Sequence, residues 1–342
     1  MYTPIYLLPQ YSPKDRSKYE DRWADPENQH IRDKVLEMIR NGAGEDFLQK
    51  IYEENLAFFE DMWDLKGIDI LEEEIKFPTT DNFEAIDFSY ATFSGSKFIN
   101  ATFVNTVFHF TKVHHSEFIN CIFAFGGFYG ASLEKTRFIN CDFIEYHRIT
   151  NCDFREVKFE NYFIPKRLFF NCKFDEQTII NDPLAKPLRM SEDSFKLSKS
   201  DLAEIFKGIK ESYMAGEVIK QARRYFYRER QFITRQNANN WRDKTGGYFL
   251  EYITGYGIKP YRVLLTMLII FFIFSVIFVA KIGVSEGLLL SAGAFFTFGA
   301  NTNYLQTLGT SFQIIYIAES FLGISLMALF ITVLANYWFR EK

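Results

Sequence analysis

The sequence has no excess of positive charge, and this limits the partners that the protein can have. It contains 39 Lys and Arg against 43 Asp and Glu, which gives a formal net charge of −4 at pH 7. A protein that binds a polyanion usually presents a basic surface. We therefore predict that this protein does not bind nucleic acid.

Catalytic and metal-binding patterns are also missing. The sequence has no evident nucleophile–base pair, phosphate-binding glycine loop or cluster of metal ligands. Its four Cys never occur in the C-x-x-C spacing that is typical of zinc sites. His109, His114, His115 and His147 have no metal-site spacing either. We expect no enzymatic activity, no cofactor and no resident metal ion.

The first residues lack the features of a secretion signal. Residues 1–4 lead into neither a basic region nor the apolar core of a signal peptide. No long apolar run occurs before residue 263. We expect residues 1–250 to lie in the cytoplasm, where Cys stays reduced.

Phenylalanine, by contrast, is abundant, with 39 residues of 342. Between residues 81 and 182 an apolar residue stands at every fifth position, with a slip of one residue after Phe143. A period of five fits neither an amphipathic helix nor a strand, so it indicates an internal repeat. The positions are Phe83, Phe88, Phe93, Phe98, Phe103, Phe108, Val113, Phe118, Phe123, Phe128, Leu133, Phe138, Phe143, Ile149, Phe154, Phe159, Ile164, Phe169, Phe174 and Ile179.

Two further periodicities support the repeat. A small residue dominates two places before these apolar positions, and all four Cys occupy such places, so we interpret them as buried structural residues. Asn100, Asn120 and Asn140 recur once in every four pentapeptides, and the slip then predicts Asn at 161 and 181, where Asn is present. One Asn in each turn of four pentapeptides predicts a ladder of hydrogen-bonded side chains, and a similar ladder would include Asn151 and Asn171.

This pattern resembles the pentapeptide-repeat family. The resemblance implies a right-handed quadrilateral β-helix, in which four five-residue sides make one coil and the apolar and small residues point inward. Residues 81–182 would form five coils, about 24 Å tall at a strand spacing of about 4.8 Å. The slip predicts a bulge at a corner within residues 144–148.

Helical spacing surrounds the repeat. Residues 28–40 and 44–64 have apolar residues at helical intervals, with a stop predicted at Asn41 and Gly42, so residues 1–80 are expected to be a helical cap. Residues 202–214, with Ser200 as the expected N-cap, and residues 217–236 predict a helical hairpin within a linker, 183–258. The second helix is basic and aromatic, and we expect it near the inner leaflet, where anionic lipids attract such charge. The hairpin resembles the linker of pentapeptide-repeat channel proteins.

Two apolar segments follow, at residues 263–282 and 312–339. Each is long enough to span about 30 Å of hydrocarbon. Lys259 and Arg262 precede the first and Arg340 and Lys342 follow the second, whereas the connection between them holds no Lys or Arg. The positive-inside rule then places both termini in the cytoplasm, so we predict a multi-pass protein of the inner cell membrane.

The connection contains a shorter apolar stretch, 287–297, that runs into Thr297, Phe298, Gly299, Ala300 and Asn301. Eleven residues are too few to span a bilayer and suit a re-entrant helix. Polar, non-helical backbone at membrane depth is tolerated only where protein or a water-filled path surrounds it. With the G-Y-G-x-x-P-x-R sequence at 255–262, this order resembles the two-transmembrane potassium-channel-like family.

The resemblance implies an all-α pore domain over residues 259–342, with 287–297 as the pore helix and 297–301 as the selectivity filter. Thr297, Phe298 and Gly299 fall on the first three places of the T-V-G-Y-G signature. Ala300 and Asn301 depart from it, which predicts a shorter or wider filter. We therefore expect permeant monovalent cations, K⁺ or Na⁺, at Thr297 and Phe298, with weak selectivity between them.

The second span supplies the other candidate residues. Glu319 is costly in lipid, so it should face protein or water, where it either supports the filter from behind or attracts ions in the vestibule. Gly323 is the predicted hinge, and Met327, Ile331 and Leu334 are candidates for an apolar gate. The sequence does not determine which of these residues face the pore axis.

The leading prediction is a multidomain homotetrameric cation channel, because one loop cannot encircle an ion. The cytoplasmic repeat would scaffold the channel or regulate its gating, with a cytoplasmic regulator of unknown identity as a further partner. The alternative is a non-conducting membrane-anchored scaffold whose repeat binds a partner. DNA mimicry needs a strongly acidic repeat, and acidic and basic residues in 81–182 are close to balanced.

Overall fold

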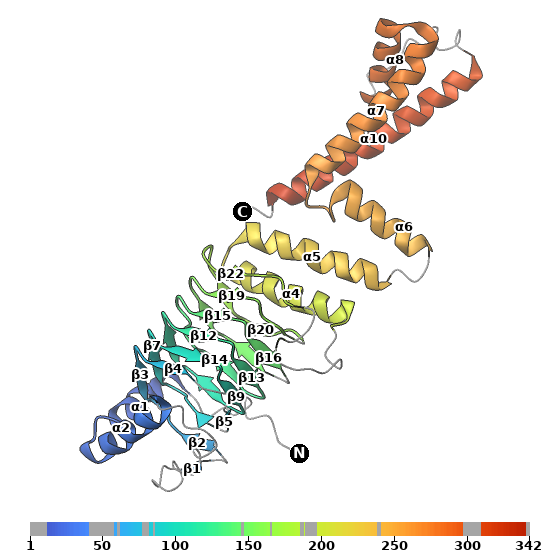
Figure 1. Ribbon diagram of the computed structural model, residues 1–342. Helices are drawn as coiled ribbons and strands as arrows, with labels where there is room; N and C mark the ends of the chain where they lie inside the picture. The colour runs from blue at the N-terminus through green and yellow to red at the C-terminus, as the bar shows by residue number, and fades with distance from the viewer. Residues whose placement is uncertain are drawn as a thin grey trace. The chain divides into compact units, whose positions relative to one another are not determined.

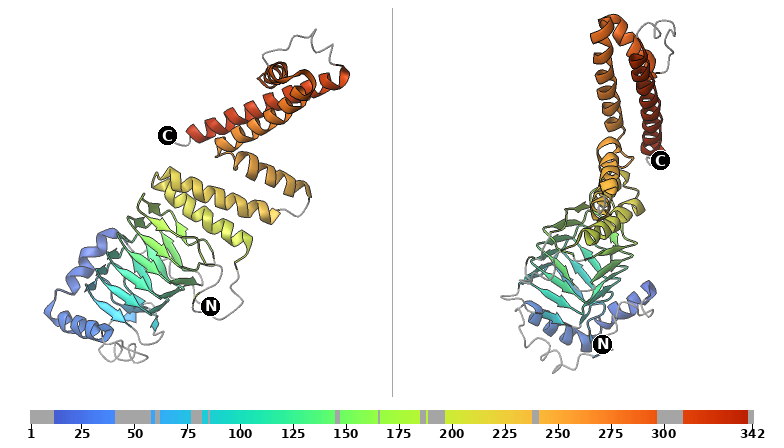
Figure 2. Two further views of the ribbon diagram at one scale, coloured as in Figure 1. Left: turned by 45° about the horizontal axis from the view of Figure 1, so that its top comes forward. Right: turned by 90° about the vertical axis from the view of Figure 1, so that its right-hand side faces the viewer.

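A computed structural model gives the fold in two compact units, Met1–Phe232 and Ile233–Lys342. It describes residues 12–40, 58–59, 62–76, 82–84, 86–144, 147–164, 166–184, 188, 197–237, 241–296 and 309–339. Figures 1 and 2 show the first unit as short stacked strands with helices at both ends, and the second as helices alone. The units are described separately below.

The first unit is a β-solenoid of about five turns. Four consecutive strands, β6 to β9, belong to four different sheets, and the same order then repeats in the next turn, so the solenoid has four faces. The first face holds β1 (Phe58–Phe59), β2 (Met62–Asp64), β6 (Ile86–Asp87), β10 (Val107–His109), β14 (Gly127–Tyr129), β17 (Arg148–Thr150) and β20 (Phe169–Phe170).

The other faces are built in the same way. The second face holds β3 (Asp69–Leu71), β7 (Thr92–Ser94), β11 (Lys112–His114), β18 (Asp153–Phe154) and β21 (Lys173–Phe174). The third holds β4 (Glu74–Lys76), β8 (Lys97–Ile99), β12 (Glu117–Ile119), β15 (Arg137–Ile139), β19 (Lys158–Glu160) and β22 (Ile179–Ile180). The fourth holds β5 (Asn82–Glu84), β9 (Thr102–Val104), β13 (Ile122–Ala124) and β16 (Asp142–Ile144).

The period of five is confirmed by the packing of the core. Phe118 pairs with Phe98 below and Phe138 above, and its ring centroid lies 5.1 Å from each of the other two. The small inward residues satisfy the carbonyls of the preceding turn: the Thr136 hydroxyl donates to the Val113 carbonyl at 2.6 Å, and the Cys121 thiol donates to the Phe98 carbonyl at 3.3 Å. All four Cys are free and buried, as the repeat predicts.

The asparagine ladder is confirmed for the three residues before the slip. The Asn120 amide donates to Asn100 at 3.2 Å, and the Asn140 amide donates to Asn120 at 3.1 Å. These residues also have φ between 53° and 63°, in the left-handed region where Asn is tolerated better than most residues. Asn161 and Asn171 have φ of 51° and 50°, so backbone conformation is a second reason for Asn at these corners.

Asn120 allows the two reasons to be separated. We expect Asn120→Ala to destabilise the protein by about 2 kcal/mol, because Ala loses the ladder bonds and is strained at positive φ. Asn120→Gly keeps the conformation and should cost about half as much. Thermal unfolding of the full-length protein measures both. Equal losses from the two substitutions would show that the ladder alone selects Asn.

The one-residue slip is also confirmed. Phe123 pairs with Phe143, whereas Gly127 pairs with Arg148, so the offset between paired residues is longer by one after the slip. The extra residue therefore falls between Ile144 and Arg148. His147 lies there with its ring 5.4 Å from that of Phe123, and its side chain is buried inside the solenoid.

The predicted start of the repeat at residue 81 was too late. Strands β2, β3 and β4 already form part of the solenoid, and residues 58–59 and 62–64 are strands rather than the end of a helix. Leu65, Ile70 and Ile75 are buried and spaced by five. Four unbroken pentapeptides would pair Ile70 with Tyr90, but Ile70 pairs with Phe93 instead, so three extra residues lie between this turn and the next. The longer offset breaks the period of five, and for this reason the sequence pattern did not reveal this turn. The predicted stop at Asn41 and Gly42 and residues 44–57 of the predicted helix lie outside the described residues.

Helices cover the beginning of the solenoid, as expected for part of residues 1–80. They are the 3-10 helix η2 (Pro13–Asp15), α1 (Arg16–Arg22) and α2 (Pro26–Arg40), the last of which confirms the helix predicted at 28–40. The Trp23 indole donates to the Lys66 carbonyl at 2.8 Å, and Val35 packs in the main core. The cap is therefore attached to the first turn of the solenoid.

The predicted hairpin is present as α4 (Lys199–Ala215) and α5 (Ile219–Asn237). Its N-cap is Ser198 rather than Ser200, because Ser198 and Asp201 form a reciprocal capping box. The Tyr213 hydroxyl donates to the Thr178 carbonyl at 2.7 Å, and the Tyr225 hydroxyl donates to the Ile180 carbonyl. The hairpin therefore closes the last turn, and the boundary between the two compact units lies within α5.

The second unit contains two helices long and apolar enough to cross a membrane. They are α7 (Pro260–Ile282), which contains an 18-residue stretch of mean hydropathy 3.1, and α10 (Thr310–Phe339), which contains an 18-residue stretch of mean hydropathy 2.1. The unit also contains α6 (Trp241–Phe249), the π-helix η4 (Leu250–Thr254) and the short apolar α8 (Val284–Phe296). Both long helices agree with the predicted spans to within three residues.

Candidate functional site

The candidate site is the packing of α8 between the two long helices. Gly283, with φ of 95°, ends α7 and allows the chain to reverse into α8. Helix α8 ends at Phe296, directly before the predicted filter. Thr297, Phe298, Gly299, Ala300 and Asn301 all lie outside the described residues, so the structure does not describe a filter.

A chain of buried polar side chains joins the three helices. Ser275 on α7 donates to the Ser291 hydroxyl on α8 at 3.0 Å, and Ser291 donates to Glu319 Oε1 on α10 at 2.5 Å. Ser275, Ser291 and Glu319 are 2%, 0% and 0% exposed. In an apolar environment each unmade hydrogen bond costs free energy. The three helices must therefore be rotated so that Ser275, Ser291 and Glu319 face one another.

Glu319 faces protein within its own chain. Its Oε1 accepts from Ser291, whereas Oε2 is buried without a hydrogen-bond partner among the described residues. The sequence had marked Glu319 but not Ser275 or Ser291. The signal in the sequence was one hydroxyl side chain in each of two otherwise apolar segments. That these hydroxyls bind each other and Glu319 is evident only once the helices are packed together.

Gly323, the predicted hinge, lies one turn after Glu319 at the closest approach of α10 to α8. A Cβ at this position would be 2.3 Å from the Phe295 carbonyl oxygen. This contact alone requires glycine, and α10 continues without a break through residue 323. Small residues commonly allow two membrane helices to approach closely in this way.

The three gate candidates are spaced i, i+4 and i+7, so they lie on one side of α10, but they differ in exposure. Met327 is partly buried against the apolar cluster of the unit, and Leu334 is half-buried. Ile331 is 58% exposed in the single chain. Ile331 is therefore the most exposed of the three.

An apolar cluster holds the same helices together around the polar chain. Phe295 on α8 lies edge-to-face with Phe271 on α7, with centroids 5.8 Å apart. The buried members of the cluster are Val263, Met267, Phe295, Leu326 and Val333. The last turn of α8 is therefore fixed from both sides.

The approach to α7 is also ordered by contacts within the unit. The Arg262 guanidinium donates to the Glu251 carbonyl at 2.7 Å, and Arg235 lies 3.8 Å from the buried Glu251 carboxylate. Tyr252 and Tyr261 are 65% and 60% exposed near the start of the helix. Exposed tyrosines at the end of an apolar helix are typical of a membrane–water boundary.

Comparison with known proteins concerns the first unit. The family model of pentapeptide repeats matches residues 86–123 with eight copies. This segment carries pentapeptide repeats. It lies within the described solenoid, whose strands continue the parallel pairing on both sides of it, so the solenoid is longer than the matched segment.

One matching solved structure is the crystal structure of a pentapeptide repeat protein (Rfr23) from the cyanobacterium Cyanothece 51142. It is 12% identical, and the match covers 34% of this chain and 88% of that chain with a TM-score of 0.16. No curated protein matches the chain.

Proposed function

We propose that the protein is a homotetrameric cation channel of the cell membrane, with the pentapeptide-repeat solenoid as a cytoplasmic scaffold or regulator of gating. One observation carries the proposal: a short apolar helix, α8, is held between two helices of spanning length by the Ser275–Ser291–Glu319 chain. Both long helices have the length and composition to cross a membrane, whereas α8 is too short. The solenoid would have the right-handed coil that the family resemblance implies.

The direction of α8 favours a cation path. Its C-terminal end, which carries the partial negative charge of the helix dipole, leads directly into Thr297. Carbonyl oxygens of Thr297 and Phe298 would then coordinate the permeant ion. Because one chain supplies only one such loop, four chains in a closed ring would complete the site.

Glu319 would act as a positioning residue for this loop. An acidic side chain within a spanning helix is expensive unless protein or water surrounds it. Here it fixes Ser291 about one and a half turns before the end of α8, and so fixes the end of the helix from which the loop begins. Ile331 would lie on the side of α10 that faces the shared axis.

Ion flux and reversal potentials of the purified protein in liposomes test the proposal. We expect cation flux with weak preference between K⁺ and Na⁺, because Ala300 and Asn301 replace the outer part of the signature. Thr297→Ala removes the hydroxyl that Thr297 can also offer and leaves its carbonyl in place; it should lower the flux at least about tenfold, if that ring of hydroxyl ligands is worth about 1.4 kcal/mol or more. Thr266→Ala, the same change within α7, should leave the flux unchanged.

The outcomes separate the alternatives. Absence of flux from a folded, reconstituted protein would favour the membrane-anchored scaffold, in which Thr297→Ala changes nothing. Strict K⁺ selectivity would keep the channel but contradict the weakened filter.

A further inference from the structure

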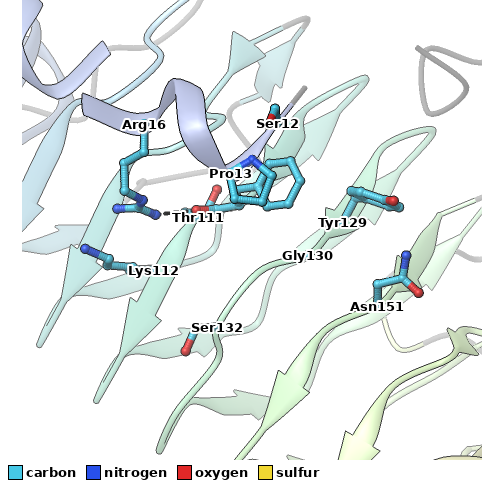
Figure 3. Close-up of a pocket in the computed structure, with 10 residues that line it drawn as sticks. Ser12, Pro13, Arg16, Thr111, Lys112, Tyr129, Gly130, Ser132 and Asn151 are labelled. Carbon is cyan, nitrogen blue, oxygen red and sulfur yellow. Dashed lines mark hydrogen bonds between the residues drawn. The ribbon is translucent and has the colours of Figure 1, made fainter. Parts of the chain in front are cut away.

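The groove between η2 and the solenoid is already filled at its centre by side chains of the protein. Its volume is about 660 Å³, and Pro13 and Gly130 are among the residues that line it (Figure 3). The Phe110 ring covers Gly130, since a Cβ there would lie 2.6 Å from that ring. The Arg16 guanidinium is bound to Glu20 and to the Phe110 carbonyl. An apolar surface that stays exposed lies instead in the second unit, just before α7.

This surface belongs to the elbow, which we define as residues 245–258, from the second half of α6 through η4. Tyr248, Phe249, Leu250 and Tyr252 are 58%, 49%, 49% and 65% exposed. Tyr248 and Tyr252 are about one helical turn apart and their ring centroids are 6.0 Å apart, so they lie on the same side. Large apolar side chains that are exposed together usually mark a surface that contacts another molecule or a membrane.

The other side of the elbow packs against the end of α5. A Cβ at Gly247 would lie 2.2 Å from the Thr234 side chain, and the Glu251 carboxylate lies 3.8 Å from the Arg235 guanidinium. Glu251 is the one charged residue in the sequence of the elbow, and it is 6% exposed. The elbow therefore turns its charge toward protein and its aromatic rings outward.

The chain changes direction between the elbow and α7, so the elbow does not extend the predicted span. Residues 255–257 have φ of 56°, 58° and 79°, which puts three successive residues in the left-handed region. Pro260 then begins α7, and Figure 1 shows α6 and α7 as separate helices that run in different directions. Tyr261 and Leu265 are 60% and 56% exposed, so the exposed apolar side of α7 begins a few residues after the elbow.

We propose that the elbow lies in the headgroup region of the inner leaflet, with Phe249 and Tyr252 in contact with lipid. Aromatic side chains are favoured at this boundary, where a helix typically enters the lipid by about 5–10 Å. The elbow does not cross the hydrocarbon, because α6 has nine residues and η4 has five. The proposal rests on the membrane location in the proposed function, but not on ion conduction.

Depth-dependent fluorescence quenching in the full-length protein tests the position of the elbow. A nitrobenzoxadiazole fluorophore is attached to Tyr252→Cys, and the protein is reconstituted in liposomes of phosphatidylcholine and phosphatidylglycerol. The four native Cys are buried, so the introduced thiol is the one that should react. We expect a nitroxide near the lipid headgroup to quench this label more strongly than a nitroxide near the end of the acyl chain. Phe249→Cys should give the same order.

Two further positions serve as controls. Phe272 is 69% exposed near the middle of α7, so a label at Phe272→Cys should be quenched most strongly by the deep nitroxide. Leu71 is 50% exposed in the first turn of the solenoid. A label at Leu71→Cys should be quenched by aqueous iodide and by neither lipid.

The results at positions 252 and 272 separate the elbow from the span. A label at 252 that neither lipid quenches, beside the expected result at 272, would overturn the lipid contact and leave the span intact; a contact with a second copy of the chain would give this result. Deep quenching at 252 that equals the quenching at 272 would also overturn the proposal. Absence of lipid quenching at 272 would contradict the membrane location itself, and the elbow proposal with it.

Discussion

Gly323→Ala is expected to reduce cation flux to background. The added Cβ would lie 2.3 Å from the Phe295 carbonyl oxygen, which is a backbone atom and cannot move independently of α8. The two helices must separate, and this weakens the hydrogen bond between Ser291 and Glu319. Overpacking of this kind typically costs about 1–3 kcal/mol, and here it displaces the helix that carries the proposed filter.

Gly246→Ala is the matched control, because a Cβ at Gly246 meets nothing within 4 Å. Gly246 lies inside α6, where Ala is the better helix former, so this change should leave flux intact and stabilise slightly. Flux into liposomes and thermal unfolding in detergent measure both variants. Normal flux from Gly323→Ala would show that the contact between α8 and α10 is unimportant for conduction.

The second large effect concerns the solenoid in acid. Burial lowers the pKa of His147 to about 3, and neither ring nitrogen has a hydrogen-bond partner among the described residues. The unfolded chain protonates this residue near pH 6.5, so its burial in the neutral form adds no cost that depends on pH above that value. As pH falls from 6.5 towards 3, stability should decrease by about 1.4 kcal/mol for each pH unit.

His147→Phe should remove this dependence, because Phe does not titrate and the site is already lined by aromatic rings of Phe123, Phe128 and Phe143. Hydrogen exchange of amides in residues 118–143, compared between the two proteins at pH 7 and pH 4.5, measures the effect locally. We expect the variant to be relatively more protected at the lower pH by about 2.5 kcal/mol.

His115→Phe changes an exposed histidine of the same solenoid and should not alter the pH dependence. His109, whose pKa burial lowers to about 4, is present in all three proteins, so its contribution cancels. If wild type and His147→Phe lose protection equally in acid, another group controls acid stability.

The solenoid could be predicted because its constraint is strictly periodic. Every fifth residue must fill the same interior, and one slip was readable because the period continued after it. The first turn was missed for the same reason: the lengthened offset between Ile70 and Phe93 removed Leu65, Ile70 and Ile75 from the counted series. A search for a period of five therefore finds only those turns of the solenoid that are four pentapeptides long.

The candidate site was less predictable because it depends on pairs of helices. Length and apolarity predicted α7 and α10, and a short apolar run predicted α8. The rotation of each helix, however, is determined by which polar groups meet. Ser275 and Ser291 have no periodic signal, and Gly323 suggested a hinge because glycine is common at bends as well as at close contacts.

The hairpin α4–α5 determines how long the solenoid can be. An open edge strand is a template on which another chain can pair, and stacked coils of one shape are especially prone to this. Here the Tyr213 and Tyr225 hydroxyls already donate to carbonyls of the last turn. Gly216 also lies so close to the solenoid that a Cβ there would be 1.8 Å from the Phe174 carbonyl oxygen. The solenoid therefore ends at a fixed height and does not continue into a fibre, so self-association must use surfaces other than this end.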